Sequence, residues 1–456
     1  MSDTIAAIAT PAAPGAIGIL RLSGSRAAEL AGAVFRPENG KPLSDRVPRR
    51  LVYGTLYDTE GRAIDKALAT WSRGPASYTG EDTAEIQCHG SPTVLALGLE
   101  ALLRAGARQA GPGEFTKRAF LNGRLDLTQA EAVADLIDAD SPAAVYQAAG
   151  QLSGALGRRV RAIYDGLVDV SAHFHAVLDY PDEDIDPFQA QTLADALETA
   201  RKDLSALLDT WKRGRLIARG VPCAIVGRPN AGKSSLLNAL LGYERAIVTD
   251  IPGTTRDTIE EKCTLGGVSL RLIDTAGLRE TADAVERLGV DRSRAALEDA
   301  ALILVLWDSS APVTEEDGAL LEQALKLAPT ILVWSKSDLP SAPVPFLNLK
   351  EMPPVVELSA KTGAGLDKLE EAVAACFPAG TTETAGELLS NARQAEAARR
   401  ALEDVERAAE SLRLGMTPDA VLMDVEAAMA ALGELTGSSI REDVTARIFA
   451  RFCVGK

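Results

Sequence analysis

Apolar and polar residues alternate along the first 120 positions in a pattern typical of a mixed α+β domain. Short apolar runs of strand length are separated by polar turns and by two segments with helical spacing. One helix is expected over 25–35, and another begins at Ser91-Pro92, where a capping residue precedes proline. The predicted strands are 4–9, 16–22, 50–56, 65–71 and 83–88. We therefore expect an N-terminal domain over residues 1–120.

A helical pattern follows, and it returns near the C-terminus. Ser141-Pro142 opens a helix predicted to reach Leu178, and Gly433 is expected to end a late one. A linker is expected at 381–386. The other predicted helices are 125–139, 191–211, 388–414, 418–432 and 441–452. We expect the segments 121–216 and 379–456 to join in one helical bundle.

Residues 217–378 show a third pattern, in which buried strands alternate with helices. Apolar strands are expected at 223–226, 268–273 and 330–334, and a helix at 235–241. This order is typical of a doubly wound α/β domain. The predicted fold class is therefore multidomain α/β plus α, with the α/β domain inserted into the helical bundle.

Composition and charge limit the classes of partner. The 456 residues suffice for about three domains of roughly 150 each. No run of about 18 apolar residues appears, and the N-terminus has no basic-then-apolar signal, so we expect a cytoplasmic protein. A net charge of −16 has the wrong sign for gripping RNA alone. Two basic clusters, 157–161 and 212–215, are interpreted first as solvated helix faces.

Cysteine and histidine usage argues against a disulfide framework, a zinc site and a histidine-based catalytic triad. Five cysteines without a C-x-x-C spacing favour neither a disulfide framework nor a zinc site. Only three histidines are present, and His173 and His175 diverge on a helix, so a histidine-based triad is not expected.

The segment from Gly227 to Ser234 fits the phosphate-binding loop G-x-x-x-x-G-K-[ST]. An apolar strand precedes it and a helix follows it, which is the context that the motif requires. Its backbone N–H groups and the helix N-terminus should cradle phosphates. Lys233 should reach the terminal phosphates, and the Ser234 hydroxyl should ligate Mg²⁺.

Three further motifs follow in the order of a G domain. Asp274 ends a strand and begins Asp-Thr-Ala-Gly, Asp338 can accept hydrogen bonds that only guanine offers, and Ser359-Ala-Lys361 completes base recognition. Gly253 to Asp257 fits the first switch, in which Thr255 would also hold Mg²⁺. The predicted GTP-binding residues are Asn230, Ala231, Gly232, Lys233, Ser234, Ser235, Thr249, Asp250, Ile251, Pro252, Gly253, Thr254, Thr255, Asp274, Thr275, Ala276, Gly277, Ser335, Lys336, Asp338, Ser359, Ala360 and Lys361.

Leu278 stands where many small GTPases have the glutamine that orients the attacking water. Either an outside protein assists hydrolysis, or another part of this chain does. The amide of Asn230 could ligate a monovalent cation beside the phosphates, or it could only tolerate a turn. Glu280, Asp283 or Glu286 could orient water, or they could be solvated switch residues.

On these motifs the chain resembles the tRNA-modifying GTPases of the MnmE/TrmE type. Three of the motifs lie in the G domain, at 227–235, 252–257 and 274–280. Two more specific ones lie outside it, Pro112-Gly-Glu-Phe-Thr-Lys-Arg-Ala-Phe-Leu-Asn-Gly-Arg-Leu-Asp-Leu127 and the terminal Phe452-Cys-Val-Gly-Lys456. The resemblance therefore spans nearly the whole chain.

The resemblance implies a function and a set of partners. Family members use GTP, Mg²⁺ and K⁺, and they add a carboxymethylaminomethyl-type group to the wobble uridine of certain tRNAs. They work with a flavin-dependent partner subunit and 5-formyltetrahydrofolate or a related tetrahydrofolate. Because the net charge of this chain is −16, we expect that tRNA is bound largely through the partner. The resemblance also implies a homodimer through a folate-binding-like N-terminal domain, with transient pairing of G domains.

The resemblance also implies site residues. Potassium would be surrounded by Asn230, Thr249, Ile251 and Thr254, and Mg²⁺ would be held by Ser234 and Thr255. Glu286 would orient the water, so the catalytic set is Glu286, Asn230 and Lys233. Folate contacts would fall on Arg21, Glu85, Arg124 and Lys456, and Cys453 is a candidate for the modification chemistry. Without the resemblance, Arg21 and Glu85 could simply pair with one another.

Two departures and two competing functions stay open at this point. Ser335 replaces the usual asparagine of the base-recognition motif, and Arg124 stands where lysine is expected. A regulatory GTPase of ribosome assembly would share the G motifs, although no basic RNA-binding module is found here. A nonenzymatic GTP-binding scaffold is opposed by the retained Ser234, Thr255 and Asp274.

Overall fold

The computed structural model describes residues 3–179, 187–243, 261–273, 297–342, 352–377, 386–439, 448–450 and 452–455. The chain forms two compact units. The first holds residues 1–134, 157–198 and 400–456, and the second holds 135–156 and 199–399. Among the described residues, no helix has the length and apolar character needed to cross a bilayer.

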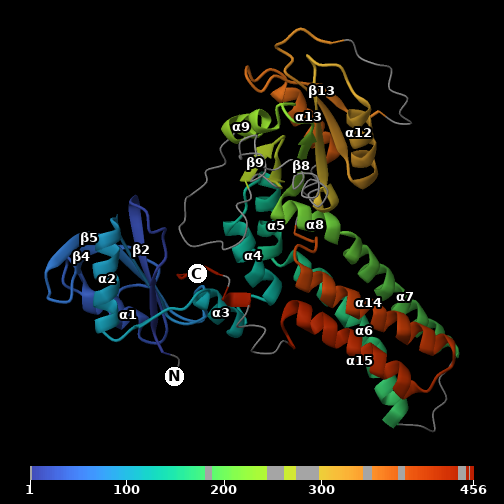
Figure 1. The fold of residues 1–456 in the computed structure, drawn as a ribbon. Coiled ribbons are helices and arrows are strands. Elements are labelled where there is room, and N and C mark those ends of the chain that lie inside the picture. The colour runs from blue at the N-terminus through green and yellow to red at the C-terminus, as the bar shows by residue number, and fades with distance from the viewer. Residues whose placement is uncertain are drawn as a thin grey trace. The chain divides into compact units, whose positions relative to one another are not determined.

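The first unit begins with a seven-stranded sheet (Figure 1), in which only β1 and β7 pair in parallel. The strand order is β3-β4-β5-β6-β2-β1-β7. The strands are β1 (Ile5–Ile8), β2 (Gly15–Ser23), β3 (Phe35–Pro37), β4 (Val52–Tyr57), β5 (Ala63–Ser72), β6 (Thr83–Gly90) and β7 (Arg108–Gln109), with a short 3₁₀ turn η1 (Leu43–Asp45). The predicted α+β domain is therefore confirmed.

Helices α1 (Ala27–Val34) and α2 (Pro92–Arg104) cover one face of this sheet. Leu20, Leu56 and Ile86 point from the strands into the core beneath them, and all three are fully buried. The other face leaves Ile17, Tyr53 and Leu68 between 37% and 63% exposed. This alternation of buried and exposed positions is typical of an antiparallel sheet packed on one side.

The rest of the first unit is helical. Helix α3 (Glu114–Leu121) follows the sheet, and α6 (Ala155–Asp179) pairs with α15 (Pro418–Thr436) through His175 and Glu426. Arg400 of α14 (Ala392–Arg413) pairs with Glu434 of α15. The unit boundaries fall within α4 (Leu127–Ile137), α6, α7 (Pro187–Asp209) and α14.

The second unit contains the α/β domain, whose six-stranded sheet has the order β13-β12-β11-β8-β10-β9. All neighbouring pairs are parallel except β9 with β10. The strands are β8 (Val221–Gly227), β9 (Glu261–Leu265), β10 (Val268–Leu272), β11 (Leu302–Asp308), β12 (Thr330–Ser335) and β13 (Val355–Glu357). The helices that lie wholly within this unit, among the described residues, are α5 (Pro142–Leu152), α8 (Trp211–Arg219), α9 (Lys233–Tyr243), α12 (Glu315–Leu327) and α13 (Leu366–Cys376).

Both faces of this sheet are buried. Leu304 and Leu306 face a core shared with α9 and α13, whereas Ile303 and Val305 face a core shared with α12. This is the arrangement expected of a doubly wound α/β domain, which the sequence predicted.

Two predicted helix boundaries were wrong. The helix expected from Ser141 to Leu178 is two helices, because the chain breaks at Ser153-Gly154, where Gly154 has a φ of 84°. The helix expected to stop at Gly433 continues to Thr436, and the left-handed stop is Gly437 with a φ of 88°. Gly433 lies inside the helix, and an added Cβ there would meet Ser439 Oγ at 2.6 Å, so the glycine allows a close approach and does not end the helix. The helix predicted at 441–452 lies mostly outside the described residues.

Candidate nucleotide-binding site and terminal-tail site

The phosphate loop connects the carboxyl end of β8 to the first turn of α9, as predicted. Asn230 has a φ of 64° and Gly232 a φ of 96°, so the loop turns through two left-handed positions. The Ala231 N–H donates to the Arg228 carbonyl at 3.2 Å, and the Leu236 N–H donates to the Gly232 carbonyl at 2.9 Å. The loop is therefore held in a tight turn between β8 and α9, the shape in which such loops bind phosphate.

Lys233 lies across this loop. Its ammonium donates to the carbonyls of Gly227 at 2.7 Å and Arg228 at 2.8 Å. Burial disfavours the charged form and lowers the pKa of Lys233. The ammonium has three donors, and two are satisfied by the loop itself, so one can serve a phosphate oxygen.

Arg228 anchors the loop to α12, which the sequence analysis missed. Its Nε donates to the carboxylate of Asp317 at 2.8 Å, and Asp317 is buried. The same carboxylate accepts from the N–H of Thr314 at 2.9 Å in a capping box. The spacing Thr-x-x-Asp before an apolar helix was a signal that could have located this partner.

The base-recognition loop follows the carboxyl end of β12. The Ser359 hydroxyl donates to Asp338 Oδ1 at 2.7 Å, and this hydrogen bond lowers the pKa of Asp338. Lys336 has a φ of 58°, and its ammonium pairs with Asp308 at 2.6 Å. Asp338 is therefore held as a carboxylate, the form that accepts hydrogen bonds from guanine.

Ser335 connects the two loops. Its buried hydroxyl lies 2.6 Å from the Ala231 carbonyl and 3.0 Å from the Trp307 carbonyl. A hydroxyl carries one proton, so it can donate to one of these carbonyls at a time. Ser335, although it is not the usual asparagine, therefore links the base-recognition loop directly to the phosphate loop.

Many predicted G-domain residues lie outside the described part of the chain. The structure brings Asn230, Lys233, Ser335 and Asp338 to the same edge of the sheet, with Ala231, Gly232, Ser234, Ser235, Lys336, Ser359, Ala360 and Lys361 on the same loops. The residues outside it are Thr249, Asp250, Ile251, Pro252, Gly253, Thr254, Thr255, Asp274, Thr275, Ala276, Gly277, Leu278, Glu280, Asp283 and Glu286.

A second candidate site lies in the first unit, where the C-terminal tail reaches the N-terminal sheet. Arg21 on β2 faces Glu85 on β6, and its Nε donates to the carboxylate at 2.8 Å. Arg21 also donates to the Gly455 carbonyl at 3.3 Å. The ion pair that the sequence left as an alternative is therefore present. Of the other predicted folate contacts, Arg124 lies beside Gly80, and Lys456 is outside the described residues.

The tail is held by residues of the motif at 112–127. The Gly113 N–H donates to the Cys453 carbonyl at 3.2 Å, and Pro112 forms a β-bridge with Val454. Gly113 has a φ of 61°, and an added Cβ would meet the Phe449 carbonyl oxygen at 2.7 Å. Cys453 is exposed. The glycine of the motif is therefore required by the close approach of the tail.

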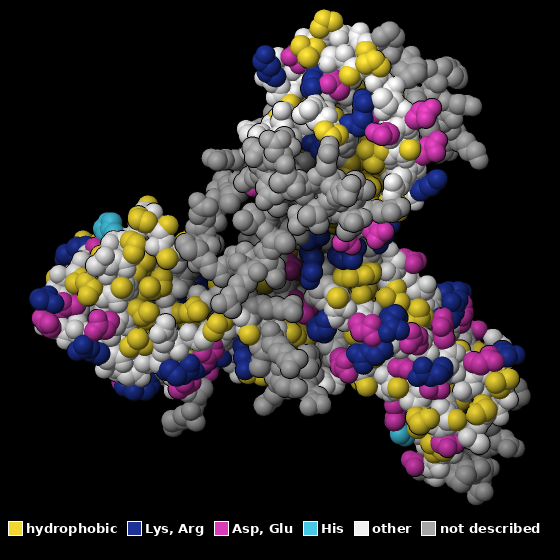
Figure 2. All heavy atoms as spheres, viewed as in Figure 1, with side chains coloured by type: hydrophobic (Ala, Val, Ile, Leu, Met, Phe, Trp, Pro, Cys, Tyr) yellow, Lys and Arg dark blue, Asp and Glu magenta, His cyan; other side chains and the backbone are white. Residues whose placement is uncertain are grey.

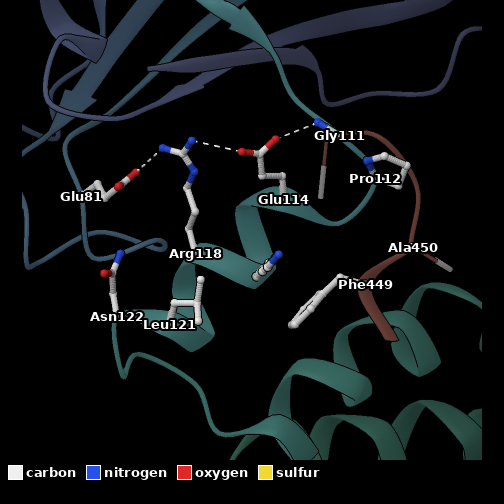
Figure 3. A pocket seen from close by; sticks show the side chains of 10 residues that line it. Glu81, Gly111, Pro112, Glu114, Arg118, Leu121, Asn122, Phe449 and Ala450 are labelled. Atoms are coloured by element: carbon white, nitrogen blue, oxygen red, sulfur yellow. Dashed lines mark hydrogen bonds and ion pairs between the residues drawn. The ribbon is translucent and has the colours of Figure 1, made fainter. Parts of the chain in front are cut away.

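A cavity of about 560 Å³ borders this tail and contains residues that the sequence analysis did not single out (Figure 3). Arg118 donates to Glu81 at 2.9 Å and to Glu114 at 3.1 Å, and Glu114 accepts from the Gly111 N–H at 2.8 Å. Burial opposes the charge of Arg118, but the bonds to Glu81 and Glu114 outweigh it and raise the pKa of Arg118. This buried network fixes the loop that holds the tail.

Comparisons with known proteins give matches that extend over nearly the whole chain. The family model described as "MnmE helical domain" matches residues 127–453, and the one described as "GTP-binding protein TrmE N-terminus" matches residues 4–124. "tRNA modification GTPase MnmE" of Chloroflexus aurantiacus is 48% identical and covers 100% of both chains. The protein of the same name from Symbiobacterium thermophilum is 46% identical, over 100% of this chain and 99% of its own.

Solved structures that match the chain cover only part of it, and a G-domain structure is among them. The G domain of the T. maritima FeoB iron transporter is 30% identical over 34% of this chain and 96% of its own, with a TM-score of 0.23. The assignment of the chain depends instead on the full-length relatives and on both family models. The chain belongs to the family of MnmE tRNA modification GTPases.

Proposed function

We propose that this GTPase is stimulated by potassium and drives wobble-uridine modification together with a flavin-dependent partner subunit. The observation that carries the proposal is the geometry of Asn230. This residue takes a left-handed conformation inside the phosphate loop, three positions before Lys233, and its side chain is exposed. An amide oxygen in this place is a suitable ligand for a hard monovalent cation beside the phosphates.

The residues of the chain divide the work of hydrolysis. Lys233 and the loop N–H groups bind and orient the phosphates, while Asp338 selects guanine. Ser234 and Thr255 would hold Mg²⁺, and Asn230, Thr249, Ile251 and Thr254 would hold K⁺. A cation there neutralises charge that builds on the breaking bond. Glu286 would orient the attacking water in place of the glutamine that Leu278 replaces.

The donor set fits this assignment. Amide, hydroxyl and carbonyl oxygens suit Mg²⁺ and K⁺, which are hard cations. Within the described residues, no group of three histidine, cysteine, aspartate or glutamate side chains gathers into a site for a transition metal. Asp274 and Gly277 complete the proposed GTP site.

The tail site supports a tetrahydrofolate ligand, 5-formyltetrahydrofolate or a related form. Arg21 and Glu85 are half-buried, and Arg21 reaches the tail near Gly455. An arginine–carboxylate pair on a sheet face can exchange one hydrogen-bond partner for a pterin or for its acidic side chain. Arg124 and Lys456 would supply further positive charge. Cys453, exposed on the same tail, would serve the modification chemistry.

The N-terminal sheet supports a homodimer. Its outer face exposes Ile17, Tyr53 and Leu68, and Arg21 and Glu85 lie on strands of the same face. An apolar sheet face of this kind is stabilised when a second copy covers it. Pairing of G domains would then be transient and would follow the nucleotide state. We place the protein in the cytoplasm and divide it as 1–120, 121–216, 217–378 and 379–456.

An amide-specific variant tests the potassium proposal. GTP turnover is measured in KCl and in NaCl for the parent, for Asn230→Gly and for Asn238→Ala. Glycine keeps the left-handed turn and removes only the amide, so it separates cation binding from turn formation. Asn238 is an exposed asparagine on α9 and serves as the control.

We expect the parent and Asn238→Ala to be stimulated by KCl, and Asn230→Gly to lose that stimulation. If Asn230→Gly were stimulated as strongly as the parent, the residue would serve only the turn. If the parent itself showed no preference for KCl, an ordinary switch GTPase, such as a regulator of ribosome assembly, would become the better assignment.

A further inference from the structure

Helix α8, which leads into the phosphate-loop strand, concentrates positive charge in a chain of net charge −16. Its nine residues include Lys212, Arg213, Arg215 and Arg219, and all four are exposed. The helix itself contains no aspartate or glutamate. The sequence alone favoured a solvated face for this cluster, but the surroundings of the helix give it a different meaning.

Three of the cations form one stripe. Lys212, Arg215 and Arg219 stand at helical spacings of three, four and seven residues, so they lie on one face. Trp211 joins this stripe, and the Arg215 guanidinium lies 5.8 Å from the centre of its ring. Gly214 faces elsewhere, and an added Cβ there would lie 2.1 Å from the Leu389 carbonyl oxygen. That close packing fixes which face of the helix stays exposed.

No carboxylate neutralises this stripe among the elements packed against α8. The helix contacts α5, β8 and β10, and none of these contains an acidic residue. Asp209 precedes the helix by two residues, and Glu387 lies two residues before Leu389, which contacts Gly214; neither forms an ion pair with α8 in the described residues. The stripe therefore presents charge that no carboxylate of the described residues pairs with.

Helix α14 shows a different arrangement, in which exposed arginines form ion pairs within the helix. Its Arg399, Arg407 and Arg413 pair with Glu396, Asp404 and Glu410 of the same helix. Figure 2 shows lysine and arginine side chains mixed with aspartate and glutamate over α14. These three cations of α14 are thus paired, whereas none of the four cations of α8 forms an ion pair with a described residue.

We propose that the α8 stripe binds the phosphate backbone of the RNA substrate, with Trp211 available to stack on an unpaired base. This inference rests on the proposed role in tRNA modification. RNA fits because a row of unneutralised lysine and arginine matches a row of phosphates, and single-stranded loops add bases that stack on aromatic rings. The full length of the helix is about 13 Å, enough for several successive phosphates.

Binding of fluorescently labelled bulk tRNA to the full chain tests the proposal. Anisotropy titrations are run from 50 to 200 mM NaCl on the parent and on the triple variant Lys212→Gln, Arg215→Gln, Arg219→Gln. Each lost phosphate contact removes about 0.7–0.9 from the slope of log affinity against log salt. We expect the slope to fall by about 2 and the affinity at low salt to fall about tenfold.

A matched variant separates a local contact from a change of overall charge. The control is a second triple variant, which removes the same charge from arginines that are paired with glutamates. It carries Arg26→Gln, Arg104→Gln and Arg413→Gln. Equal effects of the two triple variants would overturn the proposal, as would an unchanged salt slope in the α8 variant. Equal loss of binding to polyglutamate and to tRNA would indicate an acidic protein partner instead.

The same preparations distinguish this inference from the proposed function. The α8 residues lie outside the GTP site, so the α8 variant should hydrolyse GTP in KCl at the parent rate, which also shows that it is folded. If Asn230→Gly lost potassium stimulation but bound tRNA normally, the result would support the cation site and would leave the RNA contact on α8 unaffected. Normal hydrolysis with unchanged tRNA binding in the α8 variant would defeat only the RNA contact.

Discussion

The two sheets of this protein are built from similar apolar residues but are covered differently. The G-domain sheet is buried on both faces, with Leu304 on one side and Ile303 on the other. The N-terminal sheet buries Leu20 and Ile86 under its helices but exposes Tyr53 and Leu68 on the opposite face. A sheet that is covered twice can present chemistry only at its edge, whereas a sheet covered once also offers a face.

This difference assigns the sites. In the G domain, the phosphate loop and the base-recognition loop meet at the carboxyl edge of parallel strands, where ligands bind in open α/β sheets. In the N-terminal domain, Arg21 and Glu85 lie on the strands themselves, on the face that also carries the exposed apolar residues. The first arrangement suits a nucleotide, and the second is the place of the ligand and the second copy that we propose.

The largest effect is expected at the edge of the G-domain sheet. Lys233→Ala removes the ammonium that bridges the carbonyls of Gly227 and Arg228 and that should meet the phosphates. We expect GTP turnover to fall by about 10³-fold, since a preorganised charge at the reacting group contributes on that scale. Lys326→Ala, in the last turn of α12, is the control and should turn over GTP normally. A loss of less than tenfold in Lys233→Ala would contradict the assigned role.

A pair of leucine truncations tests the difference in coverage directly. Leu304→Ala opens a cavity in a fully buried position and should lower the free energy of unfolding by about 2–5 kcal/mol. Leu68→Ala trims a side chain that is 37% exposed and should cost about 0.5 kcal/mol or less in the monomer. Urea unfolding of the two variants measures both values. Equal destabilisation would mean that the outer face of the N-terminal sheet is as enclosed as the G-domain core.

The exposed sheet face should matter for association instead of folding. Leu68→Lys places a charge within the face proposed to pair, and each large apolar side chain buried there contributes about 1.5–3 kcal/mol. We expect the dimer dissociation constant to rise roughly 10- to 100-fold. Leu327→Lys, at a position 45% exposed on α12, is the matched control. Sedimentation analysis showing equal dimer fractions in both variants would exclude this face as the interface.

The comparison also explains which features the sequence could predict. Local patterns sufficed for the phosphate loop, because strand, glycines, Lys233 and helix are contiguous, and for the existence of strands β2 and β6. Contacts between distant segments were not accessible in this way. The ion pair of Arg228 with Asp317 joins residues 89 positions apart. The hydrogen bond from the Gly113 N–H to the Cys453 carbonyl joins residues 340 positions apart. The helix break at Gly154 and the helix end at Gly437 could not be predicted in this way. A glycine inside a helical pattern can either continue the helix or end it, and tertiary packing decides between the two.

The smallest effect concerns the link between the two loops of the G domain. Ser335→Ala removes the hydroxyl that lies between the carbonyls of Ala231 and Trp307, so the one donor that these two carbonyls share is lost. A missing hydrogen bond of this kind costs about 1 kcal/mol, so GTP affinity should fall roughly fivefold while turnover at saturation changes less. Ser341→Ala, at an exposed position after the same loop, should bind GTP as the parent does. If Ser335→Ala bound GTP unchanged, the hydroxyl would only fill space, and the phosphate loop would keep its shape through Arg228 and Lys233 alone.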